Sequence, residues 1–176
     1  MRLVRKALRI LLVLLVVFSV WSIFRASTPV TVFRREIQVN VPRDVAWEHF
    51  SRPMEWRSWL GDGGTPTAVT PSEVVGPDTV ARFGDSFAFR MTEFAPPDHW
   101  MWSAQAAWLT LDYDHAFEPI TDRETRMIFH MTMTGFGSDL FARVLGAVTS
   151  AGGHAEALQR LADEMNRPPA ATTPSP

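Results

Sequence analysis

The sequence predicts an α+β domain in which an antiparallel sheet packs against a long C-terminal helix, preceded by an apolar N-terminal segment. Three observations lead to this fold class. Residues 111–135 alternate in polarity like two strands folded back on each other. Further short strand-like stretches precede this hairpin, and residues 138–166 have helical periodicity. A single helix that follows a run of antiparallel strands must cover one face of their sheet.

The first 25 residues have the composition of a membrane anchor. Four basic residues precede the uncharged run 10–24, ILLVLLVVFSVWSIF, and Arg25 ends it. This run is shorter than the roughly 20 residues of a straight spanning helix, but Ala7, Leu8 and snorkelling arginines at both ends extend it, so we expect residues 8–24 to contact the membrane. The nearest cleavage candidate, Phe24-Arg25-Ala26, begins with a bulky ring, which favours an uncleaved signal-anchor over a cleaved signal and a secreted domain.

Charge predicts the orientation of this anchor and the partners of the domain. The excess of basic residues before the apolar run predicts a single-pass protein with a cytoplasmic N-terminus and an extracytoplasmic domain. The whole chain has 17 basic and 19 acidic residues. Without the five basic residues of the anchor, 12 basic residues remain against 19 acidic ones, a net charge of −7. An acidic domain without basic clusters is not expected to bind nucleic acid. The absence of Cys excludes disulfides and thiolate chemistry.

The elements of the domain follow in order from a linker over residues 26–31. Residues 32–166 are predicted to form the domain, beginning with a strand whose apolar side is Ile37, Val39 and Val41. A short helix is expected after Pro42 with Asp44 at its start, and a second helical turn after Pro53. Strands are then predicted over about 67–75, 79–84, 86–95 and 99–105, separated by turn residues rich in Gly, Pro and Asp.

The hairpin over residues 111–135 has one apolar and one polar face. The apolar parity carries Leu111, Tyr113, His115 and Phe117 in the first arm, and Met127, Phe129, Met131 and Met133 in the second. Residues 121–124 supply the turn, and Asp112, Asp114 and Glu118 fall on the opposite, solvated parity. This alternation predicts an aromatic and Met-rich inner face.

The chain closes with a long helix and a tail. Ser138 and Asp139 are helix-capping residues, and an apolar stripe predicts the face that covers the sheet. Its members are Leu140, Val144, Ala147, Val148, Ala151, Leu158, Leu161 and Met165. The pair Gly152-Gly153 is expected to bend or loosen the helix. Residues 167–176, with four prolines and no large apolar residue, are predicted to be a disordered tail.

Residues 35–165 resemble the SRPBCC or START-like superfamily, also called the Bet v 1-like fold, and most closely its polyketide cyclase/dehydrase and lipid-transport branch. The resemblance rests on the segment Val41–Trp47 with Trp56 and Trp59 after it, on Phe117-Glu118-Pro119, and on Gly135 before the final helix. It implies a helix-grip fold, in which a curved seven-stranded antiparallel sheet wraps around the long C-terminal helix and leaves a hydrophobic pocket between them. Members of the superfamily bind lipids, sterols, polyketides or other apolar molecules. Some are enzymes, and no catalytic residue is general to them.

Strand parity predicts which side chains line such a pocket. Broad rings and adaptable thioethers suit an irregular apolar guest, although each of these residues alone could equally be ordinary core. The predicted set is Trp59, Phe87, Phe89, Trp100, Trp102, Tyr113, His115, Phe129, Met131, Met133, Leu145 and Val148.

Tyr113 and His115 are the only titratable groups predicted on the inner face of the hairpin. A buried imidazole beside a phenol could act as an acid/base pair or orient a ligand carbonyl, but residues two apart on a strand lie about 7 Å apart at the backbone. A hydrogen-bonded core histidine is therefore the simpler interpretation. His154 could lie at a pocket entrance or could be solvated or packed.

Metal and cofactor sites are not expected. The sequence has no H-x-x-H, H-E-x-x-H or Cys pair, and no G-x-S-x-G. The leading functional expectation is a membrane-anchored protein that binds or carries a hydrophobic small molecule, lipid or polyketide-like, without catalysing a reaction. The alternative is a cyclase, dehydratase or hydrolase that uses His115 and Tyr113 on a polyketide-like substrate. A third hypothesis, a partner-binding module, requires an exposed apolar patch on the outer sheet face, against which the polar parity of the hairpin argues.

Overall fold

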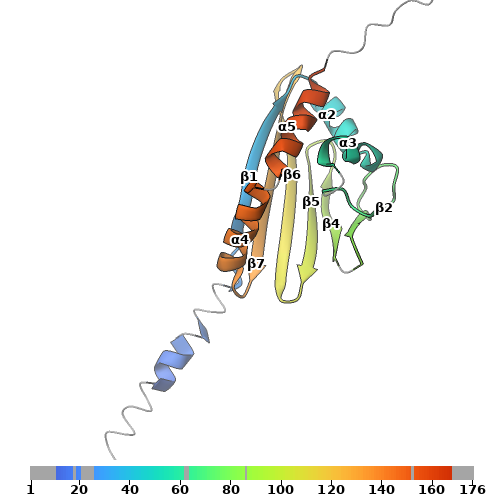
Figure 1. Ribbon diagram of the computed structural model, residues 1–176. Coiled ribbons are helices and arrows are strands. Elements are labelled where there is room, and N and C mark those ends of the chain that lie inside the picture. The colour runs from blue at the N-terminus through green and yellow to red at the C-terminus, as the bar shows by residue number, and fades with distance from the viewer. Residues whose placement is uncertain are drawn as a thin grey trace, which may run out of the picture.

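The structure is a computed structural model that describes residues 11–17, 19–20, 26–61, 64–85, 87–151 and 153–167 (Figure 1). The element order matches the α+β prediction. The strands are β1 (Val30–Val39), β2 (Ala68–Thr70), β3 (Val80–Phe83), β4 (Phe87–Ala95), β5 (His99–Ala106), β6 (Leu109–Thr121) and β7 (Glu124–Gly135). The helices are α2 (Arg43–Phe50), the 3₁₀ turn η1 (Pro53–Glu55), α3 (Trp56–Leu60), α4 (Ser138–Ala151) and α5 (His154–Met165).

All seven strands form one antiparallel sheet in the order β1-β7-β6-β5-β4-β3-β2. Strands β2 to β7 follow one another as a meander, and β1 pairs with β7 at the far edge. In Figure 1, α4 and α5 lie across β1, β6 and β7, and α2 and α3 lie at the opposite end of the sheet from α4. The predicted seven-stranded antiparallel sheet is therefore confirmed.

Some predicted boundaries differ from the observed ones. Strand β1 begins at Val30, within the segment predicted to be a linker, because Val30 pairs with Met133 of β7. Strand β2 is only three residues long and stops before Pro71, although a strand was expected to continue to residue 75. Proline has no N–H to donate to a sheet ladder, so it ends the pairing there.

The hairpin β6–β7 has the predicted inner face, and the structure adds its register. Tyr113 lies opposite Met131, His115 opposite Phe129, and Phe117 opposite Met127. Residues 122 and 123 form the turn between the arms. The two strands therefore present one continuous row of rings and thioethers to the interior.

The C-terminal helical region consists of two helices. Gly153, with a φ of 81°, precedes α5 in the left-handed region that glycine adopts without steric cost. The expected interruption at the glycine pair is therefore observed at Gly153, whereas Gly152 lies outside the described residues.

The predicted inward stripe is correct for α5 and wrong for α4. In α5 Leu158 and Leu161 are fully buried, but in α4 Leu140, Val144 and Val148 point to solvent. The reason is how closely α4 approaches β1: a Cβ atom on Gly146 would lie 2.7 Å from the carbonyl oxygen of Val32. Only a small group fits at such an approach, so the face of α4 that carries Leu140, Val144 and Val148 is turned outward.

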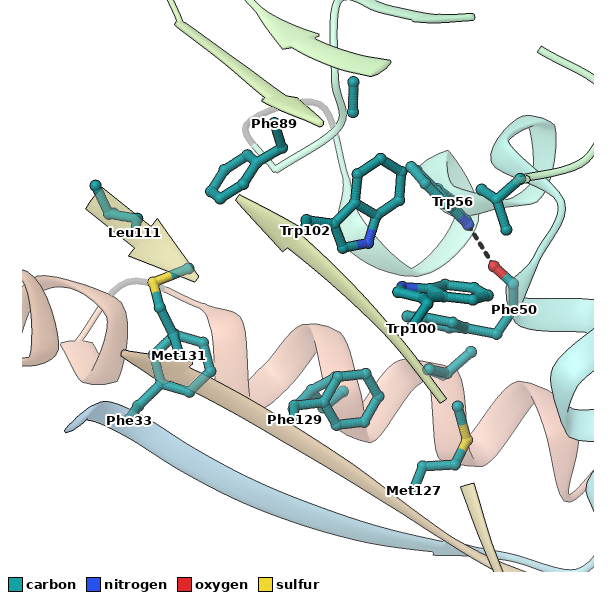
Figure 2. Packing of buried hydrophobic residues seen from close by; sticks show 14 of the residues in the cluster. Phe33, Phe50, Trp56, Phe89, Trp100, Trp102, Leu111, Met127, Phe129 and Met131 are labelled. Carbon is teal, nitrogen blue, oxygen red and sulfur yellow. Dashed lines mark hydrogen bonds between the residues drawn. The ribbon is translucent and has the colours of Figure 1, made fainter. Parts of the chain in front are cut away.

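The core centres on stacked aromatic rings between the sheet and the short helices (Figure 2). Phe50 at the end of α2 stacks on Trp59 at 5.3 Å and on Trp100 at 5.2 Å between ring centroids. The indole N–H of Trp56 donates a 2.7 Å hydrogen bond to the carbonyl oxygen of Phe50, drawn as a dashed line in Figure 2. Such ring pairs stabilise a core beyond the area that they bury, so they hold α2 and α3 firmly against β5.

Part of the predicted membrane segment is described. Residues 11–17 and 19–20 are helical, with apolar side chains that are largely exposed. Within the described residues no helix is both long enough and apolar enough to cross a membrane. The other residues of the predicted anchor up to residue 25, and residues 168–176 of the predicted tail, lie outside the described residues.

Candidate ligand pocket

A cavity of about 240 Å³ lies between the sheet, α3 and the C-terminal helices. Every strand from β3 to β7 contributes to its wall, and so do β1 and the four helices α2 to α5. The lining residues are Phe33, Phe50, Trp56, Trp59, Leu60, Gly64, Pro66, Ala81, Phe83, Phe89, Trp100, Trp102, Tyr113, His115, Met131, Thr149 and His154. None of these described lining residues is Asp, Glu, Lys or Arg. The wall is thus aromatic with a few neutral polar groups, the lining expected of a site for an apolar small molecule.

Most of the predicted pocket residues gather in this wall. Those that line it are Trp59, Phe89, Trp100, Trp102, Tyr113, His115 and Met131. The others lie elsewhere: Phe129 and Met133 are buried in the core, and Leu145 packs against it. Phe87 packs edge-on against Phe89, with ring centroids 5.2 Å apart. The prediction that Val148 faces the pocket is wrong, because its side chain is 61% exposed on the outer face of α4.

Tyr113, His115 and His154 form the polar part of the wall. The hydroxyl of Tyr113 forms a 3.2 Å hydrogen bond with Nε2 of His154. The Tyr113 and His115 rings are in direct contact, with centroids 4.1 Å apart and planes tilted by 44°. A tyrosine hydroxyl can donate one hydrogen bond and also accept, so its bond to His154 leaves a second role open to a ligand.

Burial keeps this polar cluster uncharged near neutral pH. Burial lowers the pKa of His115 well below its ordinary value, and the nearby His154 and His99 lower it further. Burial also lowers the pKa of His154, with a further contribution from Arg35. The pKa of the Tyr113 hydroxyl is raised by burial, so this group stays protonated. Both imidazoles are therefore neutral at pH 7, and each can accept or donate a hydrogen bond.

Three buried nitrogen atoms in the wall have no hydrogen-bond partner among the described residues. They are Nε1 of Trp59, Nε1 of Trp100 and Nδ1 of His115. An unpaired buried polar group costs about 1–3 kcal/mol, so native proteins rarely leave several close together. The two indole N–H groups are donors, and Nδ1 of His115 donates or accepts according to its tautomer.

Sequence reasoning missed several wall residues, for identifiable reasons. Phe33 shares the parity of Ile37 and Val39 on β1, so the strand pattern could have found it. Phe50 and Trp56 belong to the aromatic cluster of the short helices, but nothing local shows that they turn toward the sheet. His154 is 41 residues from Tyr113, and only the packing of α5 brings them together.

No group of three His, Asp or Glu side chains within the described part of the chain is arranged to hold a metal ion. Polar side chains of β5, β6 and β7 instead contact one another in pairs. His99 contacts Asp114 at 2.8 Å, and Arg126 contacts Glu118 at 3.4 Å. The pair of Arg126 and Glu118 is a surface ion pair of the kind that contributes little to stability, whereas the contact of His99 with Asp114 is an ion pair only when the imidazole is protonated.

Stability is expected to fall as the pH is lowered below about 6.5. In the unfolded chain His115 and His154 take up protons near their ordinary pKa, but in the folded domain they stay neutral. Stability from these groups is present above that pKa and is lost below it, by up to about 1.4 kcal/mol per pH unit for each histidine. Urea denaturation at pH 7.5, 6 and 5 measures the slope, and His115→Phe should reduce it. Equal slopes for the variant and the unaltered protein would contradict the buried, neutral state of His115.

The comparisons with known proteins identify the fold. No family model matches the chain, and no curated protein matches it in sequence. A protein from Thermobifida fusca, solved in solution, superposes with a TM-score of 0.60 at 17% identity, over 76% of this chain and 91% of its own. A hypothetical protein from Helicobacter pylori superposes with a TM-score of 0.58 at 15% identity, over 75% of this chain and 86% of its own. An uncharacterised protein from Rhizobium leguminosarum superposes with a TM-score of 0.54 at 14% identity, over 80% of this chain and 97% of its own. The chain therefore has the fold of these proteins.

Proposed function

We propose that the domain binds a small, uncharged, mostly apolar molecule in this cavity and that residues 8–24 anchor it to a membrane. We place it in the SRPBCC or START-like superfamily, near the polyketide cyclase/dehydrase and lipid-transport branch. The observation that carries the proposal is a cavity of about 240 Å³ with no charged side chain among its described lining residues and three unpaired polar nitrogen atoms. The anchor keeps the domain near the bilayer, in which such ligands concentrate.

Cavity size narrows the ligand class. Pockets for drug-sized ligands commonly measure about 300–1,000 Å³, and this one is smaller. A one- or two-ring compound or a short acyl chain fits such a volume better than a lipid with two chains. The absence of a cation from the described wall disfavours a carboxylate, since burying an unpaired anion is costly. A hydroxyl, ketone, ester or amide group could bond with Tyr113 and His115.

A second function, catalysis, is supported by the pairing of Tyr113 with His154 beside the unpaired Nδ1 of His115. A neutral imidazole can remove a proton next to a carbonyl group, and a tyrosine hydroxyl can donate a hydrogen bond to the carbonyl oxygen. Cyclisation or dehydration of a polyketide-like substrate needs these two roles. Tyr113 and His115 are the residues that would perform them, with His154 positioning the tyrosine hydroxyl.

One experiment tests the proposal and separates the two functions. The full chain is purified from membranes in mild detergent, and molecules that it retains are identified by native mass spectrometry followed by extraction. We expect stoichiometric retention of one class of neutral compound. After incubation with extracted lipids and polyketides, a carrier returns its ligand unchanged. An enzyme returns a new product whose formation stops in Tyr113→Phe. An empty protein that also leaves the fluorescence of an apolar dye unchanged would refute binding.

A further inference from the structure

Apart from the pocket, the domain has an exposed cluster of apolar side chains on α4 and the turns next to its start. Six large side chains are between 44% and 65% exposed. They are Trp108, Phe136, Leu140, Phe141, Val144 and Val148, and we refer to them as the apolar end. An exposed apolar group of this size, in contrast to scattered single residues, marks an interaction surface.

These residues adjoin one another. The indole N–H of Trp108, in the β5–β6 turn, donates a 2.9 Å hydrogen bond to the carbonyl oxygen of Phe136. Next to Phe136, the Cβ position of Gly137 lies 3.6 Å from the ring of Phe141. Leu140, Val144 and Val148 are four residues apart, so they follow one another along a single face of α4.

The packing of the domain does not require this surface. The inner face of α4 packs through Leu145 and three small groups, with Ala142 buried, Gly146 against β1 and Thr149 at the pocket. The neighbouring helix α5 has exposed polar residues on its outer face, among them Gln159 and Asp163. Of the two C-terminal helices, α4 thus carries the exposed large apolar side chains, together with the turns beside it.

The predicted anchor enters the domain at the same end. Strand β1 begins at Val30, which pairs with Met133 close to the end of β7, and α4 starts five residues after Met133. Figure 1 shows the start of β1, α4 and the β5–β6 turn at one end of the molecule. Val30 follows Phe24 by six positions in the chain, a length that spans about 20 Å at most. A segment embedded up to residue 24 therefore holds the apolar end within reach of the bilayer.

We propose that the apolar end inserts into the membrane surface next to the anchor, with Trp108, Phe136, Leu140, Phe141, Val144 and Val148 at the headgroup boundary. This inference rests on the proposed anchor. Aromatic residues and amphipathic helices occupy this boundary because one side of each is apolar and the other is hydrated. The contact is apolar, since the chain outside the anchor is acidic, and it needs no anionic lipid. It also places α4 between the bilayer and the pocket, because Thr149 lines the pocket on the inner side of the same helix.

The absence of cysteine allows a direct test with the full chain. Val144→Cys places a single thiol on the apolar end, and Gln159→Cys is the matched control on the exposed face of α5. Each variant is labelled with an environment-sensitive fluorophore and reconstituted into phosphatidylcholine vesicles, with or without lipids that carry a quencher on their acyl chains. We expect the label at 144 to shift to shorter wavelength and to lose most of its emission to the lipid quencher at low and high salt. The label at 159 should change in neither respect.

The outcomes separate the two proposals. A chain that floats with the vesicles but whose label at 144 stays unquenched overturns the docking surface and leaves the anchor intact. A chain that does not float with the vesicles overturns both. A label at 144 that is shielded from lipid, together with cross-linking of two unlabelled Val144→Cys chains through their introduced thiols, would show that a second copy covers the apolar end, and this also overturns the proposal.

Discussion

Replacing Ala81 with Phe is expected to abolish most ligand binding without unfolding the domain. Ala81 is 3% exposed on β3, lies opposite Phe89 of β4, and lines the cavity. A phenyl ring at this position would occupy a large part of a cavity of about 240 Å³. A guest competing with that ring meets an overpacking penalty of about 1–3 kcal/mol, which corresponds to a loss of roughly 5- to 150-fold in affinity. Titration with the retained ligand, or with an apolar dye, measures the loss.

Ala68→Phe is the matched control for this substitution. Ala68 is exposed on the neighbouring strand β2, where it lies opposite Arg82. The added ring there meets solvent, so binding should be unchanged, and thermal denaturation of both variants checks that the fold is retained. Unaltered affinity in a folded Ala81→Phe protein would mean that the ligand binds elsewhere.

Gly135→Ala is expected to have the largest effect on stability of any small substitution in the domain. Gly135 ends β7 with a φ of 130°, a conformation that residues with a side chain rarely adopt. A Cβ atom here would also lie 2.4 Å from the carbonyl oxygen of Trp108 and 3.1 Å from Cα of Leu109. Backbone strain and the clash together should lower the free energy of unfolding by about 2–4 kcal/mol, because neither contact can be relieved by rotating a side chain.

Urea denaturation compares this variant with Gly76→Ala. Gly76 has no atom within 4 Å of its Cβ position and no positive φ. Alanine at that site should change the free energy of unfolding by less than about 1 kcal/mol, with a gain expected from the reduced freedom of the unfolded chain. Similar losses in both variants would show that the close approach of β7 to the β5–β6 turn does not determine stability.

The hairpin β6–β7 illustrates what local pattern predicts well. Side chains alternate between the two faces of a strand, so Tyr113, His115 and Phe117 had to share a face whatever the rest of the chain did. Their register with Met131, Phe129 and Met127 was not encoded by the turn alone, because an irregularity between Pro119 and Thr121 shifts the pairing by one residue. The same parity argument, applied to β4 and β5, found most of the other predicted pocket residues that line the wall.

Helix α4 illustrates the limit of such patterns. A period of 3.6 residues identifies an apolar stripe, but it does not say what the stripe contacts. The stripe predicts that Leu140, Val144 and Val148 face the interior, but the structure turns them outward because Gly146 brings α4 against β1. Because the pattern predicts these residues as core, the sequence alone does not reveal the surface that we propose to dock on the membrane.

The sequence by itself determined the fold class, the strand parity and the aromatic character of the interior, because these depend on periodicities of two to four residues along the chain. The tertiary structure decided the chemistry of the pocket. It paired Tyr113 with His154 from another helix, left Nδ1 of His115 without a partner among the described residues, and kept charged side chains out of the described wall. These features depend on which elements meet in space and how closely they pack, and no periodicity within a single element encodes the distance between two of them.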